Sequence, residues 1–147
     1  MVKEDIPVSE FRRILRHFER ELNVQNQSGC CCGVTVSQCH ALMELALKDN
    51  VTMNELSGRL HLDKSTVSRT VDNLVQIGLV EREIPAMNRR TTRVSLSESG
   101  RSVCKTINEG NDRYYMEALR AIPHSNLADF LKGFEALVNG MMRLNKR

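Results

Sequence analysis

The chain has 147 residues, of which 41% are hydrophobic and 27% charged, and its formal net charge is +3. This length fits one compact domain with a single core, and the composition excludes a disordered or fibrous protein. A net charge this small permits binding to a polyanion without requiring it. Whether the chain binds one depends on where its charged residues lie.

The amino terminus carries Lys3, Glu4 and Asp5 with no apolar run behind them. We therefore expect neither a secretory signal nor a membrane anchor, and we expect the protein to lie in the cytoplasm. In that reducing compartment the five cysteines are expected to be thiols or metal ligands. Their odd number also disfavours a disulfide framework.

The first part of the chain predicts a helix followed by a loop. Residues 9–23 place apolar side chains at helical spacing on one stripe. Residues 23–33 break that stripe with Asn, Gln, Ser and Gly, and the predicted loop contains Cys30, Cys31 and Cys32.

Two capping boxes mark the next helices. Thr35 with Gln38 opens a second helix, which ends at a polar stop before residue 51. Thr52 with Glu55 opens a short third helix. This helix must end near His61, because another start signal follows at once.

Asp63 is placed to accept free N–H groups at the start of a fourth helix, and Gly78 supplies its left-handed stop. The apolar residues of this helix line one face: Val67, Val71, Leu74 and Val75. Two short helices joined by a tight turn predict a helix-turn-helix.

The period then changes from helical to alternating. Residues 80–84 and 92–96 predict the two strands of a hairpin, the wing. Its tip, residues 85–91, places Arg89 and Arg90 where no core could use them.

Ser97 is predicted to cap a long helix that Pro123 breaks, and a last helix begins near Ser125. The apolar stripe of the last helix is too wide for a terminal helix in a small monomer: Leu127, Phe130, Leu131, Phe134, Leu137, Val138, Met141 and Met142. We therefore expect a second copy of the chain to cover it. A homodimer also matches the two-fold symmetry of a DNA site, because one recognition helix contacts only one half-site.

The polar face of the fourth helix carries groups that contact DNA. Arg69 suits guanine O6 and N7, Asn73 suits adenine, and Lys64 suits a phosphate. Arginines at the wing tip suit the negative potential of a minor groove. The predicted DNA-contacting residues are Lys64, Ser65, Thr66, Ser68, Arg69, Asn73, Gln76, Arg89 and Arg90.

Three segments, Leu62–Arg69 (LDKSTVSR), Gly78–Arg82 (GLVER) and Val94–Gly100 (VSLSESG), resemble the MarR family of bacterial regulators. The resemblance implies an obligate homodimer that binds a pseudo-palindromic operator in double-stranded DNA and acts as a repressor. The family's wing commonly carries an Asp, any residue and an Arg that enters the minor groove. Here Asn88 stands at the Asp position and Arg90 at the Arg position.

We therefore predict a mainly α protein with a small β wing, forming one domain over residues 1–147. Residues 35–96 form its winged helix-turn-helix DNA-binding lobe. Residues 8–24 together with 97–147 form its dimerisation helices.

The cysteines predict an effector site. Thiolates with imidazole suit Zn²⁺, Cu(I) or As(III), and no such ion is required for the fold. Some metal sensors in the resembled family place ligands in the corresponding loop and helices. Thiol oxidation is the second interpretation, and structural thiols with a small organic effector are the third. The candidate ligands are Cys30, Cys32, Cys39, His40 and Cys104.

An enzyme and a protein–protein adaptor are the rival classes. The sequence has no Gly-rich phosphate loop, paired acidic constellation or hydrolase elbow, so we predict that it is not an enzyme. An adaptor would bind its partner without the steep salt dependence that phosphate contacts impose.

Overall fold

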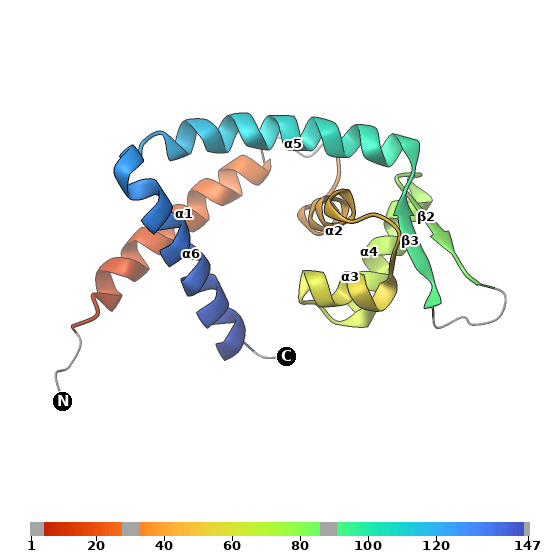
Figure 1. Cartoon of the computed structure of the whole chain (residues 1–147), viewed down its shortest axis with the longest axis horizontal. Helices are drawn as coiled ribbons and strands as arrows, with labels where there is room; N and C mark the ends of the chain where they lie inside the picture. Colours follow the sequence, from red (N-terminus) through yellow and green to blue (C-terminus); the bar gives the residue numbers. More distant parts are fainter. Residues whose placement is uncertain (1–4, 28–32, 86–90, 146–147) are drawn as a thin grey trace. The chain divides into compact units, whose positions relative to one another are not determined.

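The structure, a computed structural model, describes residues 5–27, 33–85 and 91–145. Its elements are α1 (Val8–Gln27), α2 (Val36–Leu47), β1 (Val51–Thr52), α3 (Met53–Leu60), α4 (Lys64–Gln76), β2 (Val80–Glu83), β3 (Arg93–Leu96), α5 (Glu98–Leu119) and α6 (His124–Leu144). They form two compact units, one up to Asn108 and one from Glu109 (Figure 1). The predicted mainly α class with a small sheet is confirmed.

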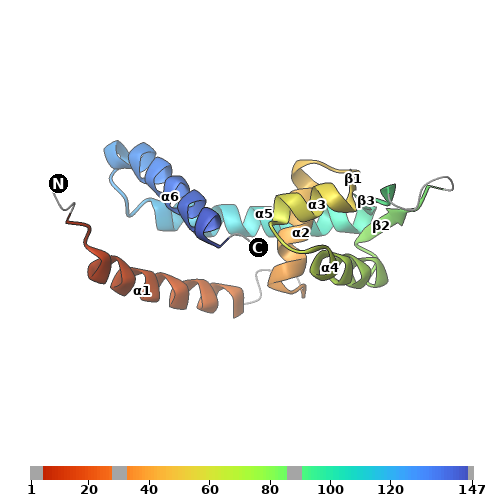
Figure 2. The ribbon, with the colours of Figure 1, turned by 90° about the horizontal axis from the view of Figure 1, so that it is seen from below.

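The core of the first unit lies among α2, α3, α4 and the three strands, which gather together in both views (Figures 1 and 2). Each of these elements except β2 contributes to its largest fully buried side chains, and α5 adds one more. These side chains are Leu42, Leu45, Val51, Leu56, Val67, Val71, Leu74, Val94 and Ile107. Because burying each such side chain stabilises a fold by roughly 1.5–3 kcal/mol, this cluster is a main source of the stability of the first unit.

The helix starts follow the capping signals. At Thr35 both halves of the box are present: Gln38 N donates to Thr35 Oγ1 over 3.2 Å, and Thr35 N donates to Gln38 Oε1 over 2.9 Å. At Thr52 the structure has the hydroxyl half, a 3.1 Å bond from Glu55 N. The first helix differs from its prediction, because α1 extends to Gln27 rather than ending at Asn23. Polar residues prolong a helix that has already nucleated when no Gly or Pro interrupts it.

The sheet is antiparallel with the order β1-β3-β2. The predicted hairpin is confirmed, with Val80 opposite Leu96 and Arg82 opposite Val94. Strand β1, in which Val51 is fully buried and pairs with Val94, was not predicted from the sequence. A strand of two residues is too short to show an alternating pattern, so only its partner strand reveals it.

The start of α5 is packed against the end of the helix-turn-helix. Ser97 Oγ accepts a bond from Gly100 N (3.0 Å) and donates one to the carbonyl of Gly78 (2.6 Å). Gly78 has a φ of +80°, which only glycine adopts without strain. Gly100 is buried, and a Cβ built on it would lie 2.0 Å from the carbonyl oxygen of Leu79.

The second unit contains the end of α5 and all of α6, in which no residue is buried. Exposed large apolar residues lie along α6: Phe130, Leu131, Phe134, Val138, Met141 and Met142. The rings of Phe130 and Phe134 stack with their centroids 5.7 Å apart. In the described part of the chain, no helix has the length and apolar character that crossing a membrane requires.

Gly100→Ala is expected to lower the free energy of unfolding by about 3 kcal/mol or more, because its Cβ has no room beside a backbone carbonyl. Gly110→Ala is the matched control, since a Cβ on this other α5 glycine meets nothing within 4 Å. It should raise the same free energy by up to about 1 kcal/mol. Urea unfolding followed by circular dichroism measures both. Equal stability of the two variants would contradict the close packing at Gly100.

Candidate DNA-binding surface

The two faces of α4 differ sharply in burial. Val67, Val71 and Leu74 are fully buried, and α4 contacts α2, α3 and β2. The helical period of 3.6 residues then turns the intervening positions outward. The exposed polar residues of this face are Lys64, Ser65, Arg69, Asn73 and Gln76, whereas Thr66 and Ser68 are half-buried. All seven were predicted to contact DNA, and their roles stay predictions.

The turn between α3 and α4 is short because His61 takes the left-handed conformation, with a φ of +54°. Leu62 N then donates to the carbonyl of Ser57 over 3.3 Å. This turn brings α3 and α4 into contact around the buried Leu56. It presents the amino-terminal end of α4 as an exposed edge, as in a helix-turn-helix.

Asp63 is the N-cap residue of α4, but its carboxylate lacks the well-formed cap hydrogen bond that was predicted, and the backbone N–H groups lower its pKa less than the two hydroxyls do. It accepts hydrogen bonds from the hydroxyls of Ser65 (2.5 Å) and Thr66 instead. Two hydroxyls on the following turn reach the carboxylate and compete with the N–H groups. These bonds, that of Ser65 first, lower the pKa of Asp63 to about 2, so the group is ionised at neutral pH.

An ion pair links α4 to the wing. Arg82 Nη1 in β2 lies 2.6 Å from Asp72 Oδ1 in α4. Their side chains are 30% and 52% exposed, so the pair adds at most about 1 kcal/mol to stability. Its effect is geometric, because it joins the base of the wing to the polar face of α4. The pair was not predicted from the sequence, since no periodic pattern relates residues in different elements.

The wing tip carries the predicted contacts Arg89 and Arg90, which lie outside the described residues, as does Asn88. At the described base of the wing, Arg93 Nη1 donates to the carbonyl of Asn50 over 2.9 Å. Arg93 therefore fixes β3 to the turn after α2.

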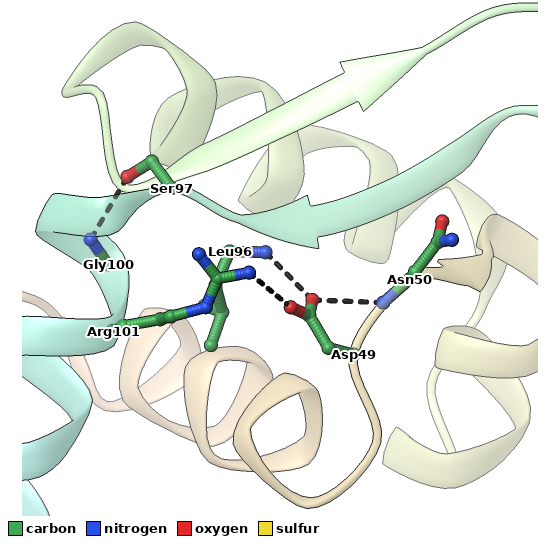
Figure 3. Close-up of polar contacts among 6 residues, drawn as sticks. All are labelled: Asp49, Asn50, Leu96, Ser97, Gly100 and Arg101. Carbon is green, nitrogen blue, oxygen red and sulfur yellow. Dashed lines mark hydrogen bonds and ion pairs between the residues drawn. The ribbon is translucent and has the colours of Figure 1, made fainter.

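A polar cluster around Asp49 connects three parts of the first unit (Figure 3). Asp49 Oδ1 accepts from the backbone N–H groups of Asn50 and Leu96, each over 2.9 Å, and Oδ2 lies 3.0 Å from Arg101 Nη2. Partial burial acts to raise the pKa of Asp49, but the hydrogen bonds and the guanidinium outweigh it and lower the pKa below 3.8. The carboxylate thus ties the turn after α2 to the end of β3 and the first turn of α5.

The predicted metal ligands are not assembled in the described part of the chain. Cys39 and Cys104 are buried, whereas His40 is exposed. Cys104 Sγ donates to the carbonyl of Leu42 over 3.5 Å, and burial, with the charge of Asp49, raises the pKa of this thiol. Among the described residues no group of three His, Cys, Asp or Glu side chains is placed to hold a metal ion. Cys30 and Cys32 lie outside the description.

The elements that form this surface are similar to known proteins. Residues 33–91, from the segment before α2 into the wing, match the MarR family. The chain is 25% identical over 141 residues to the HTH-type transcriptional regulator YsmB of Bacillus subtilis, covering 92% of this chain and 94% of that protein.

Solved structures have the same fold. FabT of Streptococcus pneumoniae, solved in complex with DNA, gives a TM-score of 0.76 at 18% identity, covering 92% of this chain and 99% of that one. A mutant MarR of E. coli, complexed with operator DNA, gives a TM-score of 0.71 at 20% identity, covering 93% and 97%. The winged helix fold of this chain is therefore that of MarR structures.

Asp49→Asn tests the polar cluster, because it removes the charge and keeps the shape. The folded-state pKa of Asp49 lies below its ordinary 3.8, so its charge stabilises the fold above that pH and stops doing so as the pH falls through the folded value. At pH 7 the variant should unfold about 1 kcal/mol more easily than wild type. This gap should close as the pH falls below 3.8.

Urea unfolding at several pH values measures the gap. Asp112→Asn is the control, because Asp112 is an exposed aspartate of α5, and its stability should stay within about 0.5 kcal/mol of wild type. A gap for Asp49→Asn that stays constant down to pH 3 would show that its charge does not stabilise the fold.

Proposed function

We propose that this chain, whose residues 33–91 match the MarR family, is a DNA-binding transcriptional regulator that acts as a cytoplasmic homodimer on a pseudo-palindromic operator. In this proposal the dimer represses transcription until an effector releases it. The observation that carries the proposal is the exposed polar face of α4 opposite its buried Val67, Val71 and Leu74. We call α4 the recognition helix.

The chemistry of this face supports reading of the major groove. Arg69 offers two donors in the geometry of guanine O6 and N7, and Asn73 offers a donor and an acceptor to adenine. Lys64 in the first turn neutralises a phosphate. The proposal places Arg89 and Arg90 of the wing in the neighbouring minor groove. Structures of FabT and of a mutant MarR with DNA support the same use of the shared fold.

The exposed apolar face of α6 supports the homodimer. Six large apolar residues of one helix are 38–48% exposed, and apolar surface gains roughly 25 cal/mol per Å² when it is removed from water. A solvent-facing row of this kind is typical of an interface. A second copy covers the row and also supplies the second recognition helix that a two-fold symmetric operator requires.

The effector is proposed to act on Cys30 and Cys32. Burial raises the pKa of the Cys104 thiol and so disfavours the thiolate that ligates metals and is oxidised, and Cys39 is buried as well. The proposal therefore assigns a thiophilic ion, Zn²⁺, Cu(I) or As(III), to Cys30 and Cys32, with the exposed His40 as an additional ligand. Thiol oxidation at the same two residues is one alternative, and a small organic effector that binds elsewhere is the second.

Arg69→Ala and Lys64→Ala test the recognition helix. Wild type should select a motif from random duplexes and lose affinity steeply as salt rises. Arg69→Ala should reduce the preference for one base at one base pair per half-site and lower the binding free energy there by about 1–3 kcal/mol. Lys64→Ala should weaken binding to all DNA sequences equally and reduce the slope of log affinity against log salt by about one. Fluorescence anisotropy measures both, with Lys132→Ala of α6 as the control for charge. A flat salt response would indicate an adaptor instead.

Cys30→Ser/Cys32→Ser tests the effector. Native mass spectrometry of the reduced wild type should show a dimer that gains mass from Zn²⁺, Cu(I) or arsenite, and this loading should weaken operator binding. The double variant should bind the operator normally and lose the response, whereas Cys104→Ser should keep it. If neither these ions nor peroxide alters DNA binding by wild type, the thiol proposal fails, and the organic effector is favoured.

A further inference from the structure

Asp63, Ser65 and Thr66 form one hydrogen-bonded group at the exposed start of the recognition helix. Ser65 Oγ lies 2.5 Å from Asp63 Oδ2, and Thr66 Oγ1 bonds to Asp63 Oδ1. Each carboxylate oxygen therefore holds one hydroxyl. Asp63 and Ser65 are exposed and Thr66 is half-buried, so the group lies at the surface that α4 presents.

The protons in this group can be counted. An ionised carboxylate only accepts hydrogen bonds, and a hydroxyl has one proton and two lone pairs. The pKa of Asp63 is lowered to about 2, so the carboxylate is ionised at neutral pH. Both hydroxyl protons must then point at Asp63. What Ser65 and Thr66 have left to offer a ligand is lone pairs, which accept hydrogen bonds and cannot donate them.

Only a few groups of DNA can donate a hydrogen bond to such an acceptor. Phosphate oxygens and the groups N7, O6 and O4 of the bases are acceptors, and two acceptors do not bond. The only donors in the major groove are the amino groups of adenine N6 and cytosine N4. A hydroxyl held by Asp63 can therefore bond adenine or cytosine and has nothing to give guanine, thymine or a phosphate.

We propose that Asp63 is a positioning residue for base selection: by holding the protons of Ser65 and Thr66, it makes the start of the recognition helix select bases with amino groups in the major groove. The inference rests on the proposed DNA-binding function and deepens it. It changes the sequence interpretation, in which these hydroxyls suited phosphates and bases equally.

Other residues of α4 supply the hydrogen-bond donors that Ser65 and Thr66 lack. Lys64 and Arg69 only donate hydrogen bonds, so they are left for phosphates and for guanine. Thr70 Oγ1 donates its hydrogen bond to the carbonyl of Thr66 within the helix, over 3.1 Å. The carboxylate of Asp63 also repels phosphates, which favours base edges over the backbone at this end of the helix.

The test compares operators selected from random duplexes by the full-length wild type and by Asp63→Asn and Asp63→Ser. Both new residues are good N-caps, so the fold of α4 should survive. Neither carries the charge that holds both hydroxyl protons. Glu81→Gln is the control, since it removes one exposed negative charge of the first unit in β2. Ser65→Ala identifies the base pair that the hydroxyl contacts.

Wild type should prefer adenine or cytosine over guanine or thymine at that base pair by about three- to tenfold, the value of one hydrogen bond. The preference should vanish in both Asp63 variants and persist in Glu81→Gln. An unchanged preference in the Asp63 variants would overturn this inference and leave the proposed function standing, and so would a guanine or thymine preference in wild type. Failure of wild type to select any motif would overturn the proposed function and this inference together.

Discussion

The burial of one face of α4 is the constraint on which the rest of this protein depends. Val67, Val71 and Leu74 are fully buried in the core that α2, α3 and the sheet share. Because the helix is rigid, this burial fixes which polar residues face outward and at what spacing. The same three side chains therefore contribute to the stability of the first unit and set the geometry of the proposed DNA-binding surface.

The start of α5 extends this rigid frame. Gly100 lets the helix approach the carbonyl of Leu79, and Cys104 and Ile107 are buried in the same core. Asp49 binds the first turn of α5 through Arg101 while accepting the N–H of Leu96 at the end of β3 (Figure 3). The first turns of α5 are thus packed into the first unit together with β3 and the turn after α2.

Two acidic residues beside the polar surface of the recognition helix have partners within the chain. Asp72 is engaged by Arg82, and Asp63 engages Ser65 and Thr66. Such internal partners restrict what a surface can bind, because each hydroxyl proton and each charge has already been used once. From composition alone, every exposed hydroxyl would be expected to donate or accept a hydrogen bond equally well. The contacts show that these hydroxyls retain acceptors only.

The sequence by itself determined the helix-turn-helix, the hairpin and the outward positions of α4, because helical period, capping signals and strand alternation are local properties. Only the tertiary structure revealed β1, the Asp72–Arg82 pair, the Asp49 cluster and the packing of Gly100. These features join residues that no periodic pattern relates. The role of Asp63 lies between the two: its place as an N-cap was visible in the sequence, but its bonds to the hydroxyls of Ser65 and Thr66 were shown only by the side-chain geometry.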